Sequence, residues 1–316
     1  MISLYAVPSL SQIKTIEPPK SPISKQNKGS SSSKNGYSNP NSPLRPGSSV
    51  KPGGTLHVPP NNKTHPESHS ERILHNQQWA VDNILNNMVY IEGGPMTMGI
   101  TDSLAKDANY DNHPAHEICL SPYYIGKYEV TEEEWLLIMG TEPSDKSNGK
   151  EVSLSCPVDN VSWDDCQEFV SKLSQLTNKP FRLPTEAEWE FAAKGGKDSA
   201  FSFSGFDTID ECGWFKVNST NVKHPVGEKS PNQLGLYDMT GNVREWCSDF
   251  YESNYYERSP ILNPEGPTQG THHVMRGGSF HNSVEECKVT YRAHTLPYNK
   301  NKFTGLRLVY SADSNP

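Results

Sequence analysis

The sequence predicts one irregular α+β domain, residues 88–312, preceded by a polar N-terminal tail. Two observations lead to this prediction. The tail is almost free of large apolar residues, whereas the rest of the chain alternates short helical patterns with short strands and many turns. Only 33% of the 316 residues are hydrophobic, and 25 Pro and 23 Gly supply turn chemistry. No repeat of fixed period appears, so a single layered core is the natural interpretation.

The tail has two parts. Residues 18–69 consist mainly of Ser, Pro, Asn, Lys and Gly, and cannot bury enough surface to offset the roughly 1–2 kcal/mol per residue that backbone ordering costs. We therefore expect a disordered linker there. Residues 1–17 include a short apolar run that fits the remnant of a signal peptide. This favours export to a periplasm, cell surface or medium, and leaves a cytoplasmic location open.

Four helices are expected. Residues 70–87 place apolar side chains on one helical face, which predicts a leading helix that packs on the domain. Thr131 and Thr185 are each followed three residues later by Glu, the spacing of a capping box. Ser162 caps a further helix between them, and Gly195 ends the last one.

The other regular elements are expected to be short strands separated by turns. Apolar and β-branched residues favour strands in five segments. These segments are 89–99, 123–130, 274–280, 287–294 and 304–310.

Composition excludes several classes of function. No stretch approaches the roughly 20 apolar residues of a membrane-spanning helix, so no transmembrane segment is expected. The formal net charge is −8, with no basic stripe to attract nucleic acid. Phosphate-loop, dinucleotide and serine-elbow motifs are absent, and the six cysteines form no CxxC pair.

One turn-rich segment carries hard oxygen donors. Asp238 and Glu245 bracket a Gly-Asn turn, so two carboxylates and several carbonyls lie within eight residues. Calcium prefers this mixture of ligands. The alternative is an ordinary tight turn with solvated acids.

Several blocks occur together in a characteristic order: RLPTEAEWEFAAKGG (182–196), GLYDMTGNVREW (235–246), MRGGSF (275–280) and YRAH…GLRLV (291–309). Together with GGPMTMG and YYIGKYEVTEEEW, they resemble the formylglycine-generating enzyme, or sulfatase-modifying factor, family. The resemblance covers about residues 88–310. It implies a variant C-type-lectin-like fold with little regular secondary structure.

The resemblance also implies a chemistry. In this family a copper-dependent oxidase converts the cysteine of a CxPxR segment in a sulfatase into formylglycine, and two thiolates hold Cu(I). The matching positions here are Asn282 and Cys287. Because Asn offers only a neutral amide, a two-thiolate site cannot form and copper is not expected. Cys287 would be catalytic only by an altered route, and Tyr298 stands where the family usually has Asp.

The same comparison strengthens the calcium hypothesis. The family holds calcium with a side-chain oxygen, two carbonyls and a Glu. These positions match Asp238, Gly241, Val243 and Glu245, and the ion would pin loops together.

Three functions are therefore compared. The favoured one is a non-catalytic binding or scaffold protein, a pseudoenzyme whose groove recognises a peptide, glycan or protein partner. The alternative is a formylglycine-generating oxidase with an altered metal site. A third is an iron enzyme forming sulfur–carbon bonds, which would need an added helical domain that this chain lacks. The groove would be lined by Ser279, His281, Asn282, Cys287, Arg292 and His294.

Overall fold

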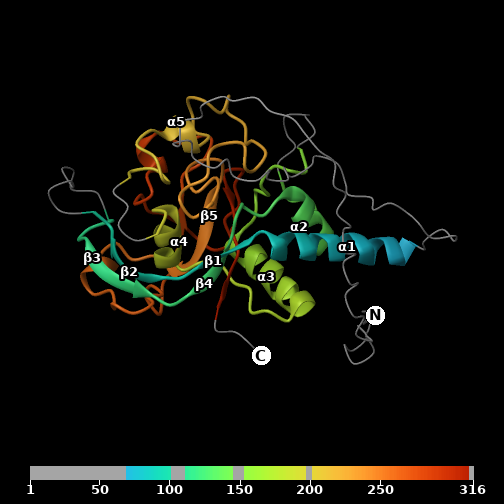
Figure 1. The fold of residues 1–316 in the computed structure, drawn as a ribbon, viewed down its shortest axis with the longest axis horizontal. Coiled ribbons are helices and arrows are strands. Elements are labelled where there is room, and N and C mark those ends of the chain that lie inside the picture. The colour runs from blue at the N-terminus through green and yellow to red at the C-terminus, as the bar shows by residue number, and fades with distance from the viewer. Residues whose placement is uncertain (1–68, 101–110, 145–152, 197–200, 313–316) are drawn as a thin grey trace, which may run out of the picture. The chain divides into compact units, whose positions relative to one another are not determined.

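The computed structural model describes residues 69–100, 111–144, 153–196 and 201–312. The predicted signal-peptide remnant and nearly all of the predicted linker lie outside these ranges. Within them the chain forms helices and three small sheets, which confirms the α+β prediction (Figure 1). Long loops join these elements.

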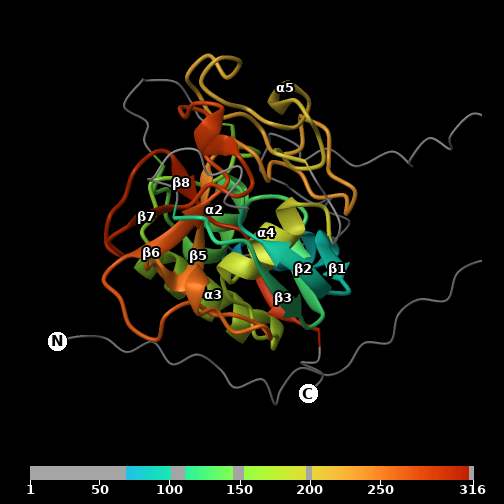
Figure 2. The same cartoon turned by 90° about the vertical axis from the view of Figure 1, so that its left-hand side faces the viewer.

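The helices form two groups. The first three pack against one another on one side of the domain (Figure 1), whereas α4 lies between a β-hairpin and a four-stranded sheet (Figure 2). The helical elements are α1 (His69–Asn86), α2 (Glu132–Met139), α3 (Trp163–Thr177), α4 (Glu186–Ala193) and the short α5 (Ile209–Cys212), with 3-10 turns η2 (Tyr255–Glu257) and η3 (Glu285–Cys287).

The three sheets have the orders β1-β4-β9, β2-β3 and β7-β6-β5-β8. Neighbouring strands are antiparallel except for β5 and β8, which run parallel. The strands are β1 (Met88–Ile91), β2 (Gly94–Met98), β3 (His116–Leu120), β4 (Tyr123–Gly126), β5 (Arg244–Phe250), β6 (His273–Arg276), β7 (Ala293–Thr295), β8 (Thr304–Gly305) and β9 (Val309–Ser311).

All three predicted caps are confirmed. The hydroxyls of Thr131, Ser162 and Thr185 each accept a hydrogen bond from the backbone N–H three residues later, and the acidic side chain at that position closes a capping box. Gly195 follows α4 with φ +79°, a conformation that glycine adopts without strain.

The strand predictions are only partly correct. The segment 89–99 forms the end of β1 and all of β2, and 304–310 contributes to β8 and β9. The segment 287–294 was expected to be one strand, but η3 occupies its start and only its end enters β7. Two strands, β3 and β5, had no prediction.

The core consists of two large clusters and one small one. One surrounds α4 and the β2–β3 hairpin, and the other joins α1, α2 and α3 to the sheets. The signature tryptophans Trp189 and Trp246 are fully buried, one in each cluster. The small cluster lies between α5 and η3.

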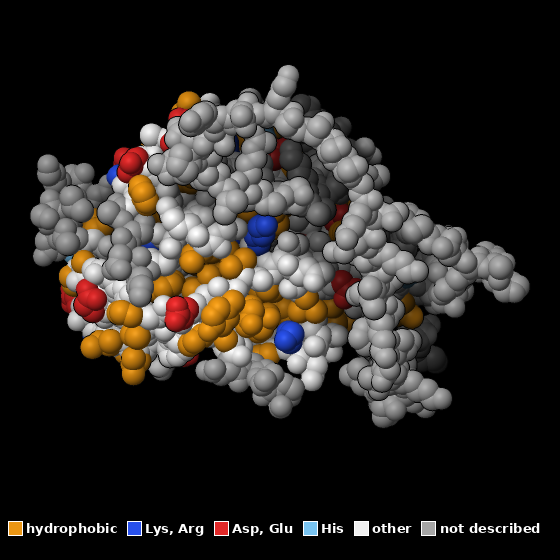
Figure 3. All heavy atoms as spheres, viewed as in Figure 1, with side chains coloured by type: hydrophobic (Ala, Val, Ile, Leu, Met, Phe, Trp, Pro, Cys, Tyr) orange, Lys and Arg blue, Asp and Glu red, His pale blue; other side chains and the backbone are white. Residues whose placement is uncertain are grey.

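The surface shown in Figure 3 carries a band of hydrophobic side chains across its lower half, with acidic and basic side chains scattered singly. The described residues on this face form no single-sign charged stripe. Among the described residues, no helix has both the length and the apolar character needed to cross a bilayer.

Candidate functional site

The residues aligned with the expected thiol pair follow β6: Asn282 lies in the segment before η3, and Cys287 is the last residue of η3. Gly278, in the segment that joins β6 to η3, has φ +70°, and a Cβ there would lie 2.5 Å from the Sγ of Cys287. Glycine is therefore required for η3 to pack directly on this turn.

A chain of hydrogen bonds occupies the position of the expected first thiolate. The hydroxyl of Ser279 donates to Oδ1 of Asn282 at 2.6 Å, and Nδ2 of Asn282 donates to Oε1 of Glu286 at 2.7 Å. Arg244, at the start of β5, contacts the same oxygen at 3.4 Å. Both the oxygen and the nitrogen of the Asn282 amide thus have a local partner, which holds the amide in one orientation.

Cys287 is a buried thiol. Its side chain has no exposed surface and lies in the small core cluster with Phe203, Phe215 and Cys212. Burial raises its pKa to about 12, so the thiol stays protonated at neutral pH. It forms no disulfide. The other cysteine near a family block, Cys247, directly follows Trp246 and belongs to a different core cluster. Cys247 therefore does not restore the pair.

An exposed surface adjoins this chain of hydrogen bonds. The ring of His281 stacks on Phe303, with ring centres 4.9 Å apart, and its Nδ1 lies 2.6 Å from Oδ1 of Asn221. The Nε atom of Arg244 is buried and has no hydrogen-bond partner. We call this surface the η3 face; it comprises Asn221, Arg244, His281, Asn282, Glu286 and Phe303.

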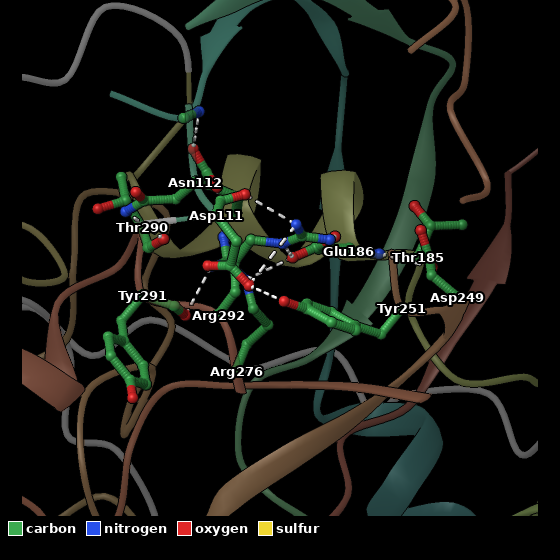
Figure 4. A network of polar contacts seen from close by, with 12 residues as sticks. Asp111, Asn112, Thr185, Glu186, Asp249, Tyr251, Arg276, Thr290, Tyr291 and Arg292 are labelled. Atoms are coloured by element: carbon green, nitrogen blue, oxygen red, sulfur yellow. Dashed lines mark hydrogen bonds and ion pairs between the residues drawn. The ribbon is translucent and has the colours of Figure 1, made fainter. Parts of the chain in front are cut away.

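Arg292 and His294 do not belong to the η3 face. Arg292 is buried and forms a two-pronged ion pair with Glu186 on α4, at 2.7 and 2.9 Å (Figure 4). His294 is exposed and stacks on Tyr251 with ring centres 3.6 Å apart. The residues predicted to line one groove therefore lie in two separate places, and the arginine predicted to line it is internal.

Arg292 belongs to a buried ionic network (Figure 4). Arg276 pairs with Glu190, and Arg292 also donates to the backbone carbonyl of Asp111 at 2.8 Å. Although burial alone would raise the pKa of Glu190, Lys194 and Arg276 lower it to about 2. The network holds α4 against the strands and loops around it, which is a structural role.

Asp249 lies beside the network without a positive partner. Its Oδ2 accepts hydrogen bonds from the backbone N–H of Glu186 at 2.8 Å and the hydroxyl of Ser248 at 3.1 Å. Burial and the neighbouring charge of Glu186 raise its pKa to about 8. At neutral pH this carboxyl is mostly protonated.

The residues predicted to hold calcium are already engaged. Glu245 accepts hydrogen bonds from Arg307 at 2.7 to 3.0 Å and from the indole of Trp189 at 2.7 Å. Asp238 accepts the N–H of Gly227 through Oδ2, and its buried Oδ1 has no partner. Because the guanidinium of Arg307 already neutralises Glu245, the set does not fit a calcium ion. Calcium binding stays a prediction of the sequence, and this geometry argues against it.

A family model described as "Sulfatase-modifying factor enzyme 1-like domain" matches residues 77–312. The chain belongs to this family. The predicted family membership is thereby confirmed.

Curated relatives of this sulfatase-modifying factor domain differ in their names. The chain is 30% identical over 279 residues to "Chaperone protein LppX" of Paenibacillus barcinonensis, which covers 72% of this chain and 90% of the relative. It is 34% identical over 174 residues to a formylglycine-generating enzyme of Streptomyces coelicolor, covering 50% and 53% of the two chains. It also matches "Serine/threonine-protein kinase pkn1" of Chlamydia caviae at 30% identity, but spans only 38% of that protein.

Solved structures show the same fold. "Treponema denticola variable protein 1" superposes with a TM-score of 0.64 at 32% identity, over 71% of this chain and 94% of that one. PvdO from Pseudomonas aeruginosa gives 0.62 at 26% identity, over 71% and 94%. The predicted fold class, a mixed helix and sheet domain of the sulfatase-modifying factor type, is confirmed.

The sequence predicted His281 and Asn282 of the η3 face but missed its other four members, Asn221, Arg244, Glu286 and Phe303. Glu286 and Arg244 are 42 positions apart and meet only because η3 folds back beside the start of β5. For Glu286 the acidic residue four positions after Asn282 was a usable signal, since that spacing brings side chains together on a helical turn. No comparable sequence signal pointed to Arg244.

Proposed function

We propose that the chain is a non-catalytic binding protein that holds a protein segment on its η3 face. The observation that carries this proposal is the set of hydrogen bonds from Ser279 through Asn282 to Glu286. These residues place hard oxygen and nitrogen groups where the family has the first of the soft sulfur donors that Cu(I) prefers. The remaining sulfur, Cys287, is a buried thiol rather than a thiolate.

The η3 face has the groups that a binding surface needs. The side chain of Arg244 is partly exposed at this face, so its guanidinium can donate to a backbone carbonyl of an extended segment. His281 and Phe303 form an aromatic pair beside it, and aromatic and arginine side chains dominate the binding energy of many interfaces. The Paenibacillus relative is named a chaperone protein, which supports a protein partner over a glycan.

Selection of peptides from a displayed random library tests the binding role. We expect selected peptides to lose at least fivefold in affinity when His281→Ala or Arg244→Ala is introduced. Arg258→Ala, which removes an exposed arginine paired with Glu252 elsewhere, is the matched control. Peptides whose affinity is the same for all four proteins would show that the η3 face is not the binding surface.

The catalytic alternative has a direct assay. The protein is incubated with Cu(I) and a CxPxR peptide, and the peptide is examined by mass spectrometry for the aldehyde. We expect no aldehyde above a protein-free control. Aldehyde that forms with the wild type and disappears with Cys287→Ser would establish the oxidase and overturn the proposal.

A further inference from the structure

A cavity of about 660 Å³ lies at the N-terminal end of α4 and shares no residue with the η3 face. Its walls come from segments far apart in the sequence. They include the turn after β3, Arg182 and Glu188, the second half of β5, the loop 263–268 and Ser311 at the end of β9. A volume of this size falls in the range of small-molecule sites.

The outer wall of the cavity is fixed in place. Asn263 accepts the backbone N–H of Ser121 at 2.7 Å and donates to its hydroxyl at 2.9 Å. Further along, Gly266 has φ +77° and packs so closely on Asp249 that a Cβ would lie 2.7 Å from the aspartate Cβ. The loop 263–268 is thus anchored at two points, and the cavity exists before any ligand arrives.

The cavity carries an excess of one negative charge. Arg182 and Glu188 form a two-pronged ion pair at 2.6 and 2.7 Å, and Glu188 also accepts the N–H of Thr185 at 2.9 Å. Arg182 is therefore committed to Glu188. Glu265 also lines the cavity, is exposed, and acts on Arg182 only through longer-range attraction. Its carboxylate is the one free for a ligand.

The rest of the lining mixes apolar and hydroxyl-bearing side chains. Leu120, Pro122, Phe250 and Pro267 contribute carbon surface, whereas the other members are mainly hydroxyl-bearing. Asp249 lies beneath Gly266 and is mostly protonated at neutral pH, so it adds little charge. An anion would meet an uncompensated carboxylate here, and a purely apolar ligand would leave the carboxylate unpaired.

We propose that this cavity binds a single positive group on a short apolar stem, the chemistry of a lysine or arginine side chain. The ammonium or guanidinium pairs with Glu265, and the stem lies against Phe250 and Pro267. The lysine of a partner protein and a free alkylamine share this chemistry, so the experiment distinguishes them. The proposal stands independently of the η3 face.

The test uses the full chain and ligand-observed saturation-transfer NMR at low salt, where surface electrostatics are least screened. The probes are N-acetyl-lysine N-methylamide, its neutral norleucine and anionic glutamate analogues, and n-pentylamine. We expect the lysine probe to bind at least fivefold more tightly than the other two amides. Binding of the lysine amide but not of pentylamine identifies a polypeptide source, and the reverse identifies a free amine. Equal binding of the glutamate probe, or no binding of either amine, overturns the proposal.

Two variants locate the binding. Glu265→Gln should reduce affinity for the bound amine at least fivefold, whereas the matched control Glu257→Gln, exposed in η2, should leave it within twofold. Thr268→Trp places a large side chain at the cavity and should abolish binding. Because all three positions are exposed, these changes leave the fold intact. Undiminished binding to Thr268→Trp would place the ligand elsewhere and refute the assignment.

Discussion

At the scale of single residues, Asp249 makes stability depend on pH. Its pKa in the folded chain is about 8, against an ordinary value of about 4. The folded state therefore holds a proton that the unfolded state has released, and stability falls as pH rises from about 4 to about 8. We expect Asp249→Asn, which keeps an acceptor for the N–H of Glu186, to flatten this decline. The mutant should be more stable than the wild type at pH 8.

Urea denaturation at pH 5 and pH 8 measures the difference. The matched control is Asp207→Asn, because Asp207 is exposed. We expect the control to follow the wild type at both values. If Asp249→Asn lost stability at pH 8, the carboxyl would be charged and paired in the folded protein.

Single residues also explain why the sequence predicted part of the candidate site and not the rest. Asn282 was informative because one residue type settles whether a thiolate pair exists. Arg292 was wrongly assigned to the groove because its partner, Glu186, lies 106 positions away in the sequence. A buried ion pair between such distant positions leaves no local sequence pattern. Arginine is mostly exposed in proteins unless it is paired, so a lining role was the natural expectation.

At the scale of elements, the helices were predictable and the strands largely were not. A capping box is complete within four residues, so the sequence contains all of its information. The strand β5 is buried on both faces along much of its length, so it lacks the polar alternation that marks a strand. The segment 287–294 has strand-like residues, but Cys287 is taken into η3 by packing on Gly278.

The cap of α3 gives a prediction at this scale. The hydroxyl of Ser162 accepts the N–H of Asp165 at 3.1 Å and donates to its carboxylate at 2.7 Å. We expect Ser162→Ala to lower the free energy of unfolding by about 1 kcal/mol, since alanine leaves that N–H without its partner. Ser171→Ala, at an exposed position of the same helix, should be neutral or slightly stabilising. Chemical denaturation compares the two, and equal losses would contradict the capping role.

At the scale of the whole molecule, Arg307 joins three distant segments. It pairs with Glu245 on β5, and it donates to the backbone carbonyls of Gly126 at 2.9 Å and Tyr237 at 2.8 Å. We expect Arg307→Met to cost about 3–5 kcal/mol, because it leaves a buried carboxylate unpaired. Arg258→Met, which breaks an exposed pair, should leave the free energy of unfolding close to that of the wild type. Urea unfolding monitored by tryptophan fluorescence compares the two variants. Similar losses in the free energy of unfolding would show that Arg307 contributes no more to stability than an exposed arginine.

The position of Arg307 also predicts how calcium affects the stability of the fold. A calcium ion at Asp238 and Glu245 would have to displace a guanidinium that is fully buried and holds Glu245 through both carboxylate oxygens. We therefore expect the melting temperature to be the same in EDTA and in millimolar calcium, because an ion that does not bind the folded state cannot stabilise it. Thermal unfolding of the full chain, with magnesium as the control ion, makes the comparison. A melting temperature that rises with calcium but not with magnesium would show that the ion binds and that Arg307 moves to admit it.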